Sequence, residues 1–114
     1  MIYFSARGFD LRGPVEGLFS GWSKVMYIYL DNNQLTGSLP ANLDKETPSL
    51  LDLVLSENQL KGEVPTSLGA LSNLVVLDLA GNELEGKLNP SLGSLESLSK
   101  YIVALSPFWM KTLC

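Results

Sequence analysis

Residues 50–73 read LLDLVLSENQLKGEVPTSLGALSN, and the pattern of Leu, Asn, Gly and Pro in this stretch recurs along the chain. The segment 74–97 repeats the Leu, Asn and Gly offsets after 24 residues, and 25–49 carries the pattern with Pro40 and one extra residue. Repeats of this length are typical of solenoid proteins, in which each repeat forms one coil stacked on the next. We therefore predict a single repeat array over residues 1–114.

Two incomplete copies flank the three full repeats. Residues 1–24 form a degenerate repeat, and 98–114 keeps the strand positions Leu98, Tyr101 and Val103 before the pattern ends in a tail. Solenoids usually need polar caps at their ends, and neither end of this array shows one. We interpret the chain as a fragment of a longer protein; the alternative is a chain that self-associates through its uncapped ends.

The apolar positions within each repeat predict a short strand. Alternation of the kind seen at Leu53 and Leu55 gives a strand with one buried face. A period of 24 residues is long enough for the crossover that joins parallel neighbours, and such crossovers are overwhelmingly right-handed. The repeats therefore predict a right-handed coil whose strands form a parallel sheet.

Asn and Gly recur where each predicted strand ends and the chain turns back. A buried amide is tolerated when backbone groups satisfy its donors and acceptor, so we expect a structural Asn ladder at Asn33, Asn58 and Asn82. Gly allows close approach or a positive φ, which we expect at Gly13, Gly37, Gly62 and Gly86.

These positions together resemble the plant-type leucine-rich repeat, L-x-x-L-x-L-x-x-N-x-L-x-G-x-I-P-x-x-L-G-x-L-x-x. The resemblance covers nearly the whole chain. It implies an α/β-type leucine-rich repeat solenoid with the parallel β-sheet on its concave face. It also implies that the variable residues between the leucines point from this face into solvent.

We call this surface the concave face, and nine of its positions are our candidate binding residues. They are Tyr3, Arg7, Tyr27, Tyr29, Asp31, Asp52, Val54, Val76 and Asp78. Tyr and Arg are enriched at binding hot spots because they combine a large rigid area with a polar group. The alternative is that the tyrosines only pair across strands, as they do on many sheets. The acidic residues are interpreted as solvated charges rather than a catalytic pair.

Composition excludes several classes of function. The chain has no His and a single Cys, Cys114, so the commonest general base and a cysteine metal cluster are both missing. The net charge is −4 and the Lys and Arg residues stand singly, which argues against nucleic acid and against direct membrane contact in this segment. No nucleophile–base pair or phosphate-binding loop is present. We predict a chain that is not an enzyme and holds no metal or cofactor.

The resemblance implies recognition of a protein or peptide ligand by the concave face, in a fragment of a receptor-like protein. The alternative is a soluble intracellular scaffold or adaptor, which the lack of Asn-x-Ser/Thr acceptors and of Cys pairs favours. The first hypothesis places the chain outside the cell or at its surface, and the second in the cytoplasm. The sequence shows no signal peptide and no transmembrane segment, so it does not decide between the two locations.

Overall fold

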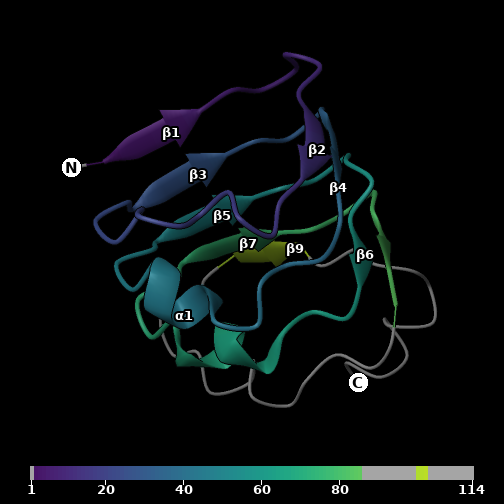
Figure 1. Cartoon of the computed structure of the whole chain (residues 1–114). Coiled ribbons are helices and arrows are strands. Elements are labelled where there is room, and N and C mark those ends of the chain that lie inside the picture. Colours follow the sequence, from purple (N-terminus) through teal and green to yellow (C-terminus); the bar gives the residue numbers. More distant parts are fainter. Residues whose placement is uncertain (1, 86–99, 103–114) are drawn as a thin grey trace.

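The computed structural model describes residues 2–85 and 100–102, in which the main feature is one parallel sheet (Figure 1). Its five strands lie side by side in chain order, one from each predicted repeat. They are β1 (Tyr3–Ser5), β3 (Tyr27–Tyr29), β5 (Asp52–Val54), β7 (Val76–Asp78) and β9 (Lys100–Ile102). The prediction of a repeat solenoid with a parallel sheet is therefore confirmed.

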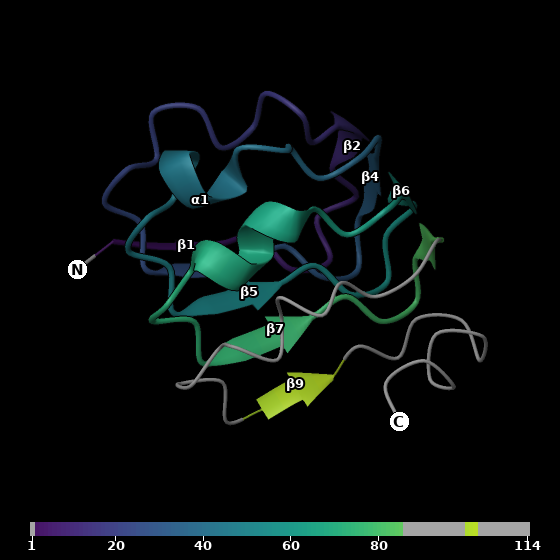
Figure 2. The same ribbon diagram turned by 90° about the horizontal axis from the view of Figure 1, so that it is seen from below.

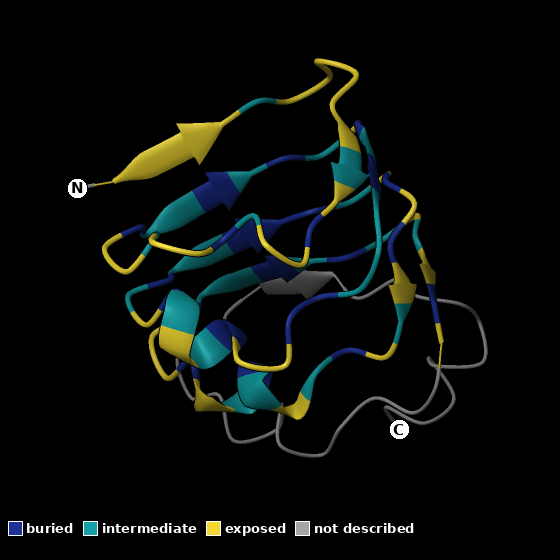
Figure 3. Cartoon of the chain, viewed as in Figure 1, coloured by how far each residue is buried: buried dark blue, intermediate teal, exposed yellow. Residues whose placement is uncertain are grey.

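The central residues of β3, β5 and β7 point into the core, and Phe4 has the equivalent position in β1. Phe4, Ile28, Leu53 and Leu77 are Cα partners along the sheet. The last three are fully buried, whereas Phe4 is 39% exposed because no further coil covers β1 in the structure. Figure 3 shows this gradient, with an exposed β1 beside the buried middles of β3, β5 and β7. The core is a column of mainly leucine side chains, in which the side chains of each coil are covered by those of the next coil.

A second set of strand pairs follows the predicted turns, and the repeat pattern did not predict it. These parallel pairs join β2 (Arg12–Pro14) to β4 (Gln34–Thr36) and β6 (Lys61–Gly62) to β8 (Glu83–Leu84). They form because the backbone is extended again after each turn and lies beside the same segment of the next coil. Backbone groups between the coils are thereby paired rather than left unsatisfied.

The glycines within these strands or directly after them adopt positive φ, as the sequence predicts. The φ angles are 110° at Gly13, 81° at Gly37 and 79° at Gly62. A side chain disfavours this conformation, which explains why Gly recurs here with the period of the coil. Gly86, the fourth glycine of the series, lies outside the described residues.

Two short helical segments cover the side of the sheet that faces the core (Figure 2). They are α1 (Leu43–Glu46) and the 3₁₀ helix η1 (Thr66–Ala70), which contact each other. Leu43 and Leu68 project from them into the core and are fully buried. The opposite side of the sheet, the concave face, is consequently left open for contacts. Among the described residues, no helix is long and apolar enough to span a membrane.

Candidate functional site

The Asn residues after the strands connect neighbouring coils through backbone groups. The Oδ1 atom of Asn58 accepts a hydrogen bond from the Leu35 N–H at 3.1 Å. Its Nδ2 donates to the carbonyl oxygens of Leu30 and Leu55, both at 3.0 Å. One buried amide thus joins two consecutive coils, and its own polar atoms are satisfied inside the protein.

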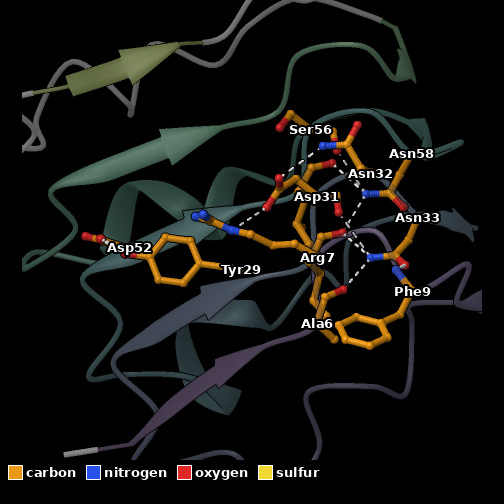
Figure 4. A network of polar contacts seen from close by, with 12 residues as sticks. Ala6, Arg7, Phe9, Tyr29, Asp31, Asn32, Asn33, Asp52, Ser56 and Asn58 are labelled. Carbon is orange, nitrogen blue, oxygen red and sulfur yellow. Dashed lines mark hydrogen bonds and ion pairs between the residues drawn. The ribbon is translucent and has the colours of Figure 1, made fainter.

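Asn82 and Asn33 make the same type of connection in the adjoining coils. Asn82 accepts from the Leu60 N–H at 3.0 Å, and Asn33 donates to the Ala6 carbonyl at 2.8 Å. The first coil has Phe9 at the ladder position, 24 residues before Asn33. Phe9 is 71% exposed, and its N–H donates to Asn33 Oδ1 (Figure 4). The Asn ladder therefore ends at the coil of β3 and does not extend into the coil of β1.

Three candidate tyrosines gather on the concave face of β1 and β3. The ring centroids of Tyr3 and Tyr27 are 6.2 Å apart, and those of Tyr3 and Tyr29 are 5.5 Å apart. Both pairs are tilted, an arrangement in which aromatic rings attract one another beyond their simple area of contact. The result is a continuous aromatic surface at one end of the sheet.

Arg7 links this aromatic surface to Asp31, and Tyr29 links it to Asp52 (Figure 4). Its guanidinium carbon lies 4.4 Å from the centroid of the Tyr29 ring, within the range of a cation–π contact. Its Nε lies 3.0 Å from Asp31 Oδ1. The Tyr29 hydroxyl donates a hydrogen bond to Asp52 on the next strand. The four side chains from three coils hold one another in place.

This environment raises the pKa of the Tyr29 hydroxyl. Desolvation, the hydrogen bond to Asp52 and the charge of that carboxylate raise the pKa of Tyr29 to about 12, from an ordinary value of 10. A protonated Tyr29 remains a donor to Asp52 across the physiological pH range.

A raised pKa in the folded state makes stability depend on pH at the alkaline end. Between pH 10 and pH 12 the unfolded chain ionises Tyr29 while the folded chain does not, so the stabilisation present below pH 10 is lost as the pH rises to about 12. We expect the Tyr29→Phe variant to lose less stability across this interval than the wild type. Urea denaturation at several pH values measures the difference.

Ultraviolet titration provides the direct check on this assignment. The difference spectrum between wild type and Tyr29→Phe reports the ionisation of that single phenol. In native protein it is expected to show a midpoint near 12, and in concentrated urea a midpoint near the ordinary value of 10. A native midpoint near 10 contradicts the assignment.

The concave face contains a hollow of about 350 Å³ beside this network. It is lined by Ser56 and by all the candidate residues except Tyr3 and Tyr27. On its floor, Asp52 pairs with Val76 and Val54 pairs with Asp78, so acidic and apolar side chains alternate across β5 and β7. Ser56 stands at the same coil position as Arg7 and Asp31, a spacing from which its place in the hollow follows.

A second, smaller hollow of about 250 Å³ lies at the exposed end of the array. Its lining includes Ile2, Phe4 and Trp22, and the rings of the last two are 4.8 Å apart. Here the apolar core reaches solvent beside the open edge of β1. Exposed apolar surface of this kind is what self-association through the uncapped ends, the alternative in the sequence analysis, would cover. The other end of the array lies outside the described residues.

The described carboxylates do not form a group able to hold a metal ion. The hollow instead offers one aromatic ring, an arginine, carboxylates and valines on a fixed sheet. Such a mixture is suited to non-covalent recognition of another chain.

Comparison with protein families identifies the repeats directly. The family model described as Leucine Rich Repeat matches residues 24–45, 49–71 and 73–95. A curated relative, the LRR receptor-like serine/threonine-protein kinase GSO2 of Arabidopsis thaliana, is 33% identical over 74 residues. That match covers 65% of this chain and 6% of the kinase. The chain therefore spans a small part of the length of this relative.

Solved structures show the same architecture. The BIR2 ectodomain from Arabidopsis thaliana superposes with a TM-score of 0.81 and 29% identity, over 84% of this chain and 50% of the ectodomain. The Arabidopsis receptor kinase HAESA, solved with the peptide hormone IDA and the co-receptor SERK1, gives a TM-score of 0.80 and 32% identity. That superposition covers 88% of this chain and 16% of HAESA.

Proposed function

The chain belongs to the Leucine Rich Repeat family, and from this premise we propose that its concave face recognises a protein or peptide ligand. The observation that carries the proposal is the hollow of about 350 Å³, in which Arg7, Tyr29 and Asp52 are already held in fixed positions. Side chains ordered before binding lose little conformational entropy when a ligand arrives. Tyr and Arg are also the residue types that contribute most at binding hot spots.

We further propose that the chain is part of a receptor-like protein at the cell surface. Its similarity to GSO2, and to HAESA in complex with a peptide hormone, supports this interpretation. A soluble intracellular scaffold is the second candidate, favoured by the absence of Asn-x-Ser/Thr acceptors from the sequence. The mass of the native polypeptide in its source cells distinguishes them. A much heavier chain with a secretion signal supports the receptor, and a chain of 12.4 kDa inside the cell supports the scaffold.

Selection from a displayed random-peptide library tests recognition while the natural ligand is still unidentified. We expect peptides enriched on the wild-type chain to bind the Tyr27→Ala/Tyr29→Ala double variant at least about tenfold more weakly, since two hot-spot side chains are removed. Isothermal titration calorimetry with the enriched peptides gives the affinities, and circular dichroism shows whether the double variant is folded.

The Phe9→Ala variant is a matched control for this test. Phe9 is a large exposed aromatic side chain that belongs to neither the hollow nor the tyrosine cluster. Its removal is expected to leave peptide affinity within about twofold. If the folded double variant binds the enriched peptides like the wild type, the tyrosines are ordinary sheet surface and the proposed site is wrong.

A further inference from the structure

The floor of the concave hollow alternates carboxylates with valines on two neighbouring strands. Asp52 and Val54 lie on β5, and Val76 and Asp78 lie opposite them on β7 with the order of charge reversed. The two aspartates therefore lie on one diagonal of this four-residue square, and the two valines lie on the other. Val54 is buried and Val76 is half-buried, so the floor has an apolar part beside each carboxylate.

The one arginine of the hollow is already engaged with other groups. Its Nε pairs with Asp31, and its guanidinium stacks on the Tyr29 ring. Asp52 accepts from the Tyr29 hydroxyl, and Asp78 accepts from the backbone N–H of Ala80. Both of these donors are uncharged, so the negative charges of Asp52 and Asp78 are not neutralised by any described cation.

Aromatic rings complete the surroundings of this negative charge. Tyr27 is the Cα partner of Asp52 on the neighbouring strand, and Tyr29 reaches Asp52 through its hydroxyl. One face of the Tyr29 ring is already covered by Arg7, and Tyr27 does not line the hollow. The apolar floor and the two carboxylates favour the same class of ligand, which combines an aliphatic stem with a positive charge.

We propose that the hollow receives a lysine or arginine side chain from an extended segment of the bound protein or peptide. The aliphatic stem packs on Val54 and Val76, and the cationic group lies between Asp52 and Asp78. A volume of about 350 Å³ is at the lower end of the usual range for ligand sites, about 300–1,000 Å³. This volume suits one or a few side chains. The inference rests on the proposed function and adds the chemistry of the partner.

A metal ion is a poorer occupant of the same place. Among the described residues, no three His, Cys, Asp or Glu side chains are grouped so that they could hold one. An ammonium or guanidinium group carries several donors and is larger than a metal ion, so it can bridge carboxylates that stand diagonally on a sheet.

Two capped tripeptides that differ only in charge provide the test: acetyl-Gly-Lys-Gly-amide and its norleucine analogue, which keeps the stem and lacks the ammonium group. Each is titrated into the ¹⁵N-labelled full chain, and amide shifts are followed by NMR. We expect the lysine peptide to give saturable shifts at Asp52, Val54, Val76 and Asp78, with at least fivefold tighter binding than the norleucine peptide. Equal shifts with both peptides overturn the proposal.

Charge-removing variants locate the effect. Asp52→Asn and Asp78→Asn keep an acceptor for the Tyr29 hydroxyl and the Ala80 N–H, so they are expected to fold normally. Each is expected to weaken lysine-peptide binding at least threefold. Glu63→Gln removes an equal charge from an exposed position outside the hollow, and it is expected to change binding less than twofold. Equal losses in all three variants mean general attraction to an acidic chain and overturn the proposal.

Lys100 requires its own variant because it is the Cα partner of Val76 on β9. We expect Lys100→Gln to bind the lysine peptide at least as tightly as the wild type does. If lysine-peptide binding appears only in Lys100→Gln, the hollow is occupied by the chain's own lysine and the proposal is wrong.

The library selection separates this inference from the proposed function. If the enriched peptides lack Lys and Arg but still lose affinity for the Tyr27→Ala/Tyr29→Ala variant, the proposed ligand recognition holds and the proposal of a cationic ligand is wrong.

Discussion

Replacement of Asn58 by leucine is expected to lower the free energy of unfolding by about 3 kcal/mol, because the buried amide is replaced by a group that cannot hydrogen-bond. The N–H of Leu35 loses its acceptor at 3.1 Å, and a buried unsatisfied donor costs about 1–3 kcal/mol. The carbonyl oxygens of Leu30 and Leu55 each lose one donor as well. They keep the bonds from Asn33 and Asn82, which limits the loss at these two groups.

Thermal unfolding followed by circular dichroism measures this effect. For a domain of this size, about 3 kcal/mol corresponds to a fall in Tm of roughly 10 °C or more. Asn42→Leu is the matched control, because Asn42 is exposed and its side chain makes no capping hydrogen bond to α1. Its substitution is expected to change stability by less than about 0.5 kcal/mol. Equal melting temperatures for Asn58→Leu and the wild type contradict a stabilising role for the ladder.

The coil period was sufficient to predict the sheet and its register. Each strand must return to the same place in the next coil, so a spacing of 24 or 25 residues pairs Tyr3 with Tyr27, and Asp52 with Val76. The alternation of apolar residues then assigns one side of every strand to the core. Register and face together determine which side chains line the hollow, even though no single residue carries a recognisable functional motif.

Features that depend on side-chain conformation were not accessible from the sequence. The position of Arg7 over Tyr29 and the hydrogen bond from Tyr29 to Asp52 involve rotamers that the repeat pattern does not specify. The backbone also adopts positive φ just before the ladder asparagines, at Asn32 (58°) and Glu57 (56°). A glutamate such as Glu57 seldom adopts this left-handed conformation, so the sequence does not predict it there. The geometry of the whole coil imposes it.

Truncation of Leu53 to alanine is expected to cost about 3–4 kcal/mol, which is within the range for fully buried leucines. Leu53 lies at the middle of β5 between Ile28 and Leu77, and all three are fully buried. The coils on both sides are held apart by their own backbone pairing, so they cannot collapse into the vacated space. A cavity therefore remains, and it adds to the lost transfer free energy. Urea denaturation of Leu53→Ala measures the change.

The same truncation at the exposed end provides the comparison. Phe4 occupies the equivalent strand position in β1 but is 39% exposed, and its ring packs against that of Trp22 with the centroids 4.8 Å apart. Phe4→Ala removes more atoms than Leu53→Ala, yet we expect it to cost only about 1 kcal/mol, because those atoms are already partly hydrated. This inverted order follows only if each coil is stabilised by the neighbour that covers it. A larger cost for Phe4 than for Leu53 means that β1 is covered in solution, by a second copy or by another chain.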